Sequence, residues 1–125
     1  ELNQTSQTML SKVDAVIVPS DNTIAGSMGV LVKNADVVNK PVFPSADTMV
    51  KDGGVASISL SQYGQGKAAG KMAARILKGE KPGQMAVNNY HHGKPVLNLK
   101  QAHKLGIKVP ADFQQEEEQH GTVFK

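Results

Sequence analysis

One sequence pattern occurs twice between residues 13 and 47, and it limits the fold more than any other feature of the chain. An apolar segment, residues 14–18 in the first copy and 41–43 in the second, ends at a Pro-Ser pair, and an acid follows, Asp21 or Asp47. Proline ends each segment as a strand because it cannot donate to a sheet ladder. In a parallel α/β sheet, the carboxyl ends of neighbouring strands open into one crevice where ligands bind. We therefore predict an α/β fold whose two polar loops face one binding site.

Composition excludes several classes of protein. At 125 residues and 39% hydrophobic, the chain can build one ordinary core. The net charge of +3 comes from scattered cations, and the aromatic content of 4% gives little support for a nucleic-acid platform. The absence of cysteine excludes disulfides, thiolate zinc sites and cysteine nucleophiles. No apolar run approaches the roughly 20 residues that span a bilayer.

Periodicity and helix breakers predict the elements of the first half. Residues 2–10 have helical spacing, and because this pattern starts abruptly we expect a piece of a longer chain. The continuous apolar run 15–18 is typical of a central strand covered by helices on both faces. A helix is predicted over residues 24–33, followed by a turn at 36–40 and a short strand at 42–43.

The second half is predicted in the same way. Residues 55–60 alternate as a strand with one polar side. The longest helix, ending at Gly79, carries an apolar stripe on residues 68–77 and a solvated cationic face made of Lys67, Lys71, Arg75 and Lys78. Strands are expected at residues 85–87 and 95–97. A capping box starts a short helix over residues 98–105.

No catalytic or metal-binding pattern stands out. His91 and His92 are adjacent, so on a strand they point to opposite faces and cannot chelate one ion together. His103 and His120 lie far away in sequence. The chain shows no Ser-His-Asp order, no paired catalytic carboxylates and no Gly-rich phosphate loop. We expect neither an enzyme nor a bound cofactor or metal.

The order of the motifs resembles a known family. The matching segments are residues 13–23, 40–43, 53–56, 66–82 and 98–106. Together they resemble the substrate-binding proteins of bacterial ABC transporters, and most closely the branch with tryptophan- and tyrosine-binding lipoproteins. The resemblance covers about residues 2–110. It implies a type I periplasmic-binding fold, in which two α/β lobes with parallel sheets flanked by helices close on a ligand between them.

The resemblance also implies a domain organisation in which this chain is the C-terminal portion, mostly the second lobe. Residues 2–61 and 95–112 would belong to that lobe, residues 62–94 would belong or cross to the first lobe, and residues 113–125 would be a polar, solvated tail. The first lobe, the signal sequence and the lipid-anchoring cysteine would lie outside this chain. The implied partner is a membrane permease, at the periplasmic or extracellular face of the cytoplasmic membrane.

The ligand-binding residues implied by the resemblance lie in three segments. The first is the loop Ser20, Asp21, Asn22 and Thr23, and its neighbour on the cleft is Ser45, Ala46 and Asp47. The third segment is residues 59–63, in which Ser61 and Tyr63 are the implied ligand-binding residues. Relatives tend to carry an acid followed by an aromatic residue where this chain has Ser61 and Gln62, so the resemblance does not fix the ligand.

The chemistry of an amino acid ligand fits the first loop. Its ammonium needs an acid and its carboxylate needs donors, which Asp21 and the free N–H groups of the helix start can supply. The alternative is that Asp21 is an N-cap and nothing more. The same two alternatives stay open for Asp47, while Tyr63 is either an aromatic wall of the site or a core residue.

Three functions are compatible with these features. The first is a transporter binding protein that takes a small ligand, with an aromatic amino acid favoured. The second is the effector-binding domain of a transcription regulator, which uses the same lobes, and the third is a flavodoxin-like single-domain protein or enzyme. A signal peptide with a lipobox cysteine upstream would select the first, and a helix-turn-helix would select the second.

Overall fold

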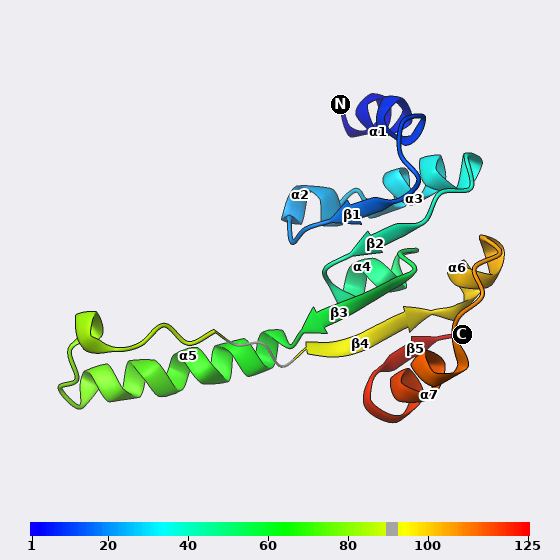
Figure 1. The fold of residues 1–125 in the computed structure, drawn as a ribbon. Coiled ribbons are helices and arrows are strands. Elements are labelled where there is room, and N and C mark those ends of the chain that lie inside the picture. The colour runs from blue at the N-terminus through cyan, green and yellow to red at the C-terminus, as the bar shows by residue number, and fades with distance from the viewer. Residues whose placement is uncertain (90–92) are drawn as a thin grey trace. The chain divides into compact units, whose positions relative to one another are not determined.

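The computed structural model describes residues 1–89 and 93–125, leaving aside the side chains of residues 116 and 117. The chain forms two compact units, which we describe separately: unit 1 contains residues 1–59 and 94–125, and unit 2 contains residues 60–93. Figure 1 shows the elements in order. They are α1 (Leu2–Leu10), β1 (Val16–Val18), α2 (Asn22–Ala25), α3 (Met28–Val37), β2 (Val42–Pro44), α4 (Asp47–Lys51), β3 (Ala56–Leu60), α5 (Gln62–Leu77), the 3-10 turn η1 (Pro82–Gln84), β4 (Gly93–Asn98), α6 (Leu99–Lys104), α7 (Ala111–His120) and β5 (Thr122–Phe124).

Unit 1 contains two small sheets with parallel pairs. Strands β1 and β2 run parallel, with Ile17 opposite Phe43. The second sheet has the order β3-β4-β5, and β4 and β5 run parallel, whereas the arrows of β3 and β4 point in opposite directions in Figure 1. Backbone bonds join the sheets, because Val55 N–H donates to the carbonyl of Val42 at 2.8 Å and the Val55 carbonyl accepts from Asn98 N–H at 2.8 Å. The predicted α/β fold class is confirmed.

The main core of unit 1 lies where α1 and α3 pack with the β1–β2 sheet. Its buried residues are Leu10, Val16, Val18, Met28, Leu31, Val32, Ala35, Val42 and Met49. A smaller cluster contains Val55, Ala102 and Leu105. Burying one large apolar side chain stabilises a fold by about 1.5–3 kcal/mol, so these contacts hold the short strands in place.

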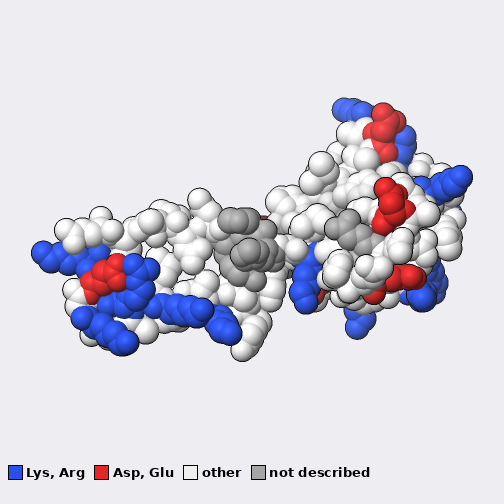
Figure 2. Space-filling view, turned by 60° about the horizontal axis from the view of Figure 1, so that its bottom comes forward, with Lys and Arg blue, Asp and Glu red and all other residues white. Residues whose placement is uncertain are grey.

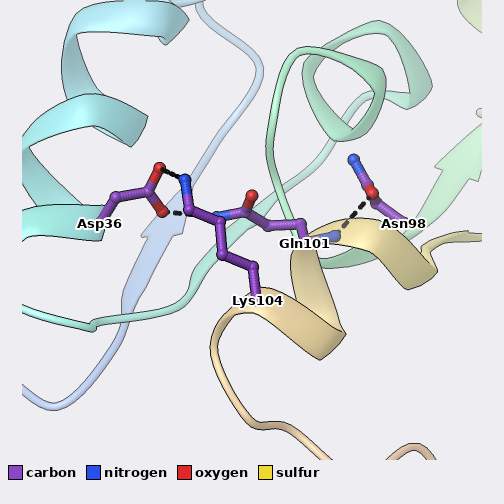
Figure 3. A network of polar contacts seen from close by, with 4 residues as sticks. All are labelled: Asp36, Asn98, Gln101 and Lys104. Carbon is purple, nitrogen blue, oxygen red and sulfur yellow. Dashed lines mark hydrogen bonds and ion pairs between the residues drawn. The ribbon is translucent and has the colours of Figure 1, made fainter.

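A polar network connects α3 with α6 (Figure 3). Gln101 Nε2 and Lys104 Nζ donate to the two carboxylate oxygens of Asp36, at 2.7 Å and 2.5 Å. Asn98 Oδ1 accepts from Gln101 N–H at 2.9 Å, which confirms the predicted cap of the short helix. In a full capping box the Gln101 side chain would also accept from Asn98 N–H. This second bond is absent, because Asn98 N–H donates to the Val55 carbonyl and the Gln101 side chain donates to Asp36 instead.

The first strand differs from its prediction. The run of apolar residues indicated a central strand covered on both faces, yet Ile17 is 82% exposed. Within the described residues, β1 pairs with β2 and with no other strand. A continuous apolar run therefore predicted the strand correctly and its burial wrongly.

The helix predicted over residues 24–33 is two helices. It breaks at Gly26 and Ser27 between α2 and α3, where Gly26 is the C-cap of α2. Helix α3 then runs to Val37, past the predicted start of the turn, and the chain reverses through Asn39 at φ 54°. The predicted N-cap, Asp21, is confirmed.

Strand β3 exposes the face that alternation predicted to be apolar and buried. Ser59 is 8% exposed, whereas Ile58 is 63% exposed. Ser59 is tolerated inside because its hydroxyl accepts a hydrogen bond from Asp47 N–H at 3.2 Å. A tertiary contact therefore decides which side of this strand faces the core.

The chain end, predicted to be a polar, solvated tail, forms regular secondary structure. Residues 111–120 form α7, and Asp112 lies in its first turn, where a negative charge interacts favourably with the helix dipole. Strand β5 follows and pairs with β4 from Thr122 to Phe124. The sequence Thr-Val-Phe suits a strand, and the backbone of β4 supplies the partner that a solvated tail lacks.

Unit 2 consists of α5, η1 and the segment that follows. Ser61 Oγ accepts from Gly64 N–H at 3.1 Å and caps α5. No residue of α5 is buried in the described chain; within the predicted apolar stripe, Ala68 and Met72 are half-buried and Leu77 is 88% exposed. The four cations are exposed as predicted, and Figure 2 shows Lys and Arg side chains at the surface.

Two further features complete unit 2. Arg75 forms a bidentate pair with Glu80 beyond the helix end, which raises the pKa of Arg75 and lowers that of Glu80. The prediction of a strand at residues 85–87 is wrong, because this segment pairs with no described strand. The assignment of residues 62–94 to a first lobe remains a prediction.

The turn before β3 supplies a test of this packing. A Cβ on Gly54 would lie 2.5 Å from Pro44 Cγ and Cδ, so we expect Gly54→Ala to destabilise unit 1 by about 2 kcal/mol or more in urea unfolding. A Cβ on Gly29 would meet nothing within 4 Å, so Gly29→Ala is the matched control and should be neutral or slightly stabilising. Equal stabilities of the two variants would contradict the close approach at Gly54.

Candidate functional site

The loops after β1 and β2 meet at the carboxyl end of their sheet. Ser20 Oγ and Ser45 Oγ share a hydrogen bond of 2.9 Å. Ser45 N–H donates to the Val18 carbonyl at 2.9 Å, which continues the β1–β2 pairing into the second loop. The structure thus brings together the two polar loops that the repeated sequence pattern places after parallel strands.

Asp21 begins the first loop's helix. Its Oδ1 accepts from Ile24 N–H at 2.9 Å, and its extended backbone, φ −144° and ψ 125°, is usual for an N-cap. The residue is exposed, and no hydrogen bond from a described residue reaches Oδ2. One carboxylate oxygen caps the helix while the other faces solvent, so capping and ligand binding are compatible roles. Asn22 and Thr23 follow as exposed residues of α2.

Asp47 has a similar place in the second loop. It is exposed in the first turn of α4, and its Oδ1 accepts from Thr48 N–H at 2.8 Å. Ala46 is the N-cap and offers no side-chain bond, so the α4 start depends on Ser59, whose hydroxyl accepts from Asp47 N–H. The sequence predicted no helix at residues 47–51, and it placed Ser59 in the third cleft segment without assigning it this contact.

Ser61 and Tyr63 belong to unit 2. Ser61 is half-buried and caps α5, and Tyr63 is 81% exposed, so Tyr63 is not a core residue of the described chain. Their predicted roles at the ligand stay predictions.

The assembled loops carry hydrogen-bonding groups and negative charge, and no metal centre. Two serine hydroxyls and two exposed carboxylates can accept bonds from an ammonium, and the hydroxyls can also donate to a carboxylate. Among the residues that the structure describes, no group of three His, Cys, Asp or Glu is placed to hold a metal ion. His91 and His92 lie outside the described residues.

Comparison with known proteins gives the family. The family model described as ABC transporter substrate binding protein matches residues 1–120. The chain belongs to this family. Its members bind substrates rather than convert them, so the prediction that the chain is not an enzyme is confirmed, and the family decides among the three functions that the sequence left open.

Solved structures of relatives show the same fold. The ABC domain of Streptococcus pneumoniae in complex with L-Trp matches 99% of this chain at 43% identity and a TM-score of 0.87. A conserved domain protein from Vibrio cholerae matches 99% at 27% identity and a TM-score of 0.84. The chain spans 41% and 40% of these two proteins. A tyrosine-binding protein of Clostridioides difficile (strain R20291) is 29% identical over 98 residues, which cover 78% of this chain and 28% of that protein.

These matches confirm the resemblance to this family that the sequence motifs indicated, over part of the relatives' length. In the described part of the chain, no helix is both long and apolar enough to cross a membrane.

The cap at Asp21 gives a stability prediction. Asp21→Ala removes the acceptor of Ile24 N–H, so we expect unfolding free energy to fall by about 1 kcal/mol, the usual value of an N-cap. Asp21→Asn keeps a side-chain oxygen at this position and should change stability by no more than a few tenths of that. Chemical denaturation of the three proteins measures both, and equal losses in the two variants would contradict the cap.

Proposed function

We propose that this chain is part of the substrate-binding component of a bacterial ABC importer that binds an amino acid, with an aromatic side chain favoured. The family assignment, a relative in complex with L-Trp and a relative named for tyrosine binding support this ligand class. In this proposal residues 2–61 and 95–112 form the second lobe of a two-lobe protein, and residues 62–94 belong or cross to the first lobe. A membrane permease is the partner, at the outer face of the cytoplasmic membrane, where a lipid anchor holds the whole protein.

The observation that carries the proposal is the meeting of the two loops through Ser20 and Ser45. This contact holds Asp21 and Asp47 on loops that follow neighbouring parallel strands, the usual location of ligands in α/β sheets. A solvent-facing carboxylate oxygen can bind the ammonium of an amino acid in a charge-assisted bond, which is stronger than a neutral one.

The remaining predicted residues complete the proposed site. Asn22 and Thr23 lie in the first turn of α2, where backbone N–H groups favour a ligand carboxylate, and Ala46 is the N-cap of α4. Ser61 and Tyr63, at the start of α5, contribute from the connection to the first lobe, with Tyr63 as an aromatic wall. Closure of two lobes would then remove the charged groups from water, which strengthens their interaction.

Asp21 separates the proposed binding role from capping. Asp21→Asn keeps the helix cap and removes the negative charge, so we expect the affinity of the intact two-lobe protein for its amino acid to fall by about 1.5–3 kcal/mol, the range for hydrogen bonds to charged groups. Calorimetry with L-tryptophan and L-tyrosine measures the change. Asp14→Asn removes a charge that pairs with Lys40 away from the loops and is the control. An unchanged dissociation constant in Asp21→Asn would leave Asp21 with the capping role alone.

The isolated 125-residue chain is expected to bind amino acids weakly even when folded. It spans 41% of the relative that was solved with L-Trp, so it would supply one wall of the proposed cleft. Without the second wall the ligand stays hydrated, and a contact between unit charges is worth about 1 kcal/mol in water. We expect a dissociation constant weaker than about 1 mM, followed by NMR shifts of the amides from Ser20 to Thr23 during titration. Saturation at micromolar tryptophan, tyrosine or phenylalanine would contradict the two-lobe proposal.

A further inference from the structure

Helix α4 carries the second candidate loop at its start, and buried polar side chains hold both of its ends. At the first residue, Ser59 Oγ accepts from Asp47 N–H at 3.2 Å. In the last turn, Asn98 Nδ2 donates to the Val50 carbonyl at 2.9 Å. Ser59 is 8% exposed and Asn98 is 7% exposed. Breaking either bond would leave a polar group with little access to water.

These two side chains come from the strands that connect the two units along the chain. Ser59 lies on β3 and is the last residue of unit 1 before residues 60–93. Asn98 ends β4, the strand on which the chain returns to unit 1. The two strands are neighbours in one sheet, and Asn98 N–H donates to the Val55 carbonyl just before β3. Helix α4 is therefore attached by side chains to both connecting strands.

Neither residue is explained by core packing. A serine inside a sheet costs free energy unless its hydroxyl is hydrogen-bonded, and β3 buries Ser59 while exposing the apolar Ile58 beside it. Asn98 uses both ends of its amide, since Oδ1 caps α6 at Gln101 while Nδ2 holds α4. The core side of the helix between these contacts is fully buried, with Met49 1% and Val50 0% exposed. A helix buried in this way moves together with the strands β3 and β4 that hold it.

We propose that Ser59 and Asn98 are positioning residues of the ligand site, which fix α4 by its two ends and make the place of the loop from Ser45 to Asp47 depend on both connecting strands. This inference rests on the proposed function, because it needs the loop to bind the ligand. Ser59 and Asn98 do not touch the ligand themselves. A displacement of β3 or β4 during lobe closure reaches the loop through these two hydrogen bonds.

The test uses single substitutions in the intact two-lobe protein. Ser59→Ala removes the acceptor of Asp47 N–H, and Ser59→Thr keeps a hydroxyl and should restore binding. Asn98→Asp keeps an oxygen for Gln101 N–H but loses the donor to Val50. Ser57→Ala changes a half-buried serine of the same strand and is the matched control.

Two measurements are made on each variant, at a temperature where all are folded. One is the dissociation constant for L-tryptophan and L-tyrosine. We expect about a tenfold loss in Ser59→Ala and in Asn98→Asp, recovery in Ser59→Thr, and less than a twofold change in Ser57→Ala. The double variant of Ser59→Ala with Asn98→Asp should lose less than the product of the single losses, because both act on α4. The other measurement is hydrogen exchange at the Asp47 amide without ligand, which should be about tenfold faster in Ser59→Ala.

The outcomes separate this inference from the proposed function. Faster exchange at Asp47 with an unchanged dissociation constant would overturn it, because the bond would then serve the fold alone. If the wild-type protein binds neither amino acid, the proposed ligand class fails, and the exchange rates then test whether Ser59 positions the loop. In that case equal rates in Ser59→Ala and Ser57→Ala would overturn the positioning of the loop, and faster rates in Ser59→Ala would support it for a ligand of another class.

Discussion

The backbone of Val55 is the connection on which unit 1 depends. Its N–H bonds to Val42 in one sheet and its carbonyl bonds to Asn98 in the other, while its side chain is 3% exposed in the smaller core cluster. Two glycines before it make this approach possible. Gly53 has φ +119°, a conformation that L side chains rarely adopt, and Gly54 lies where any Cβ would collide with Pro44. At this junction, backbone hydrogen bonds join two sheets whose strands are only three to six residues long.

The candidate site follows from how β1 and β2 end. Both strands stop where the chain turns into a short helix, and Asp21 and Asp47, which we propose for the ligand, also accept hydrogen bonds from backbone N–H groups of these helices. Asp21 gives one oxygen to the helix and leaves the other to solvent, and Asp47 similarly bonds Thr48 within its own turn. These carboxylates can therefore accept hydrogen bonds from the backbone and bind a ligand at the same time. Substitutions that keep the cap and remove the charge can separate them.

Helix α5 of unit 2 shows that an amphipathic pattern predicts a helix without predicting its burial. The spacing of apolar residues along residues 68–77 correctly predicted a helix, since α5 runs from Gln62 to Leu77. The apolar stripe that this spacing forms has no buried residue in the described chain, however. Periodicity describes which residues share a face, whereas burial requires a partner surface for that face. The same distinction applies to Ile17 on β1.

The sequence by itself determined the elements whose signals are local: the first helix, the cap at Asp21, the cap at Asn98 and the order of motifs that resembles the family. Neighbouring residues carry such signals, so no distant contact is needed to interpret them. Tertiary structure alone decided that Ser59 faces inward, that α4 forms after the second loop and that the last residues of the chain form β5. Each of these depends on a bond to a residue remote in sequence: Asp47 for Ser59, Asn98 for Val50, and the backbone of β4 for β5. Local periodicity cannot predict a hydrogen-bond partner far along the chain, because the two residues come close together only when the sheets form.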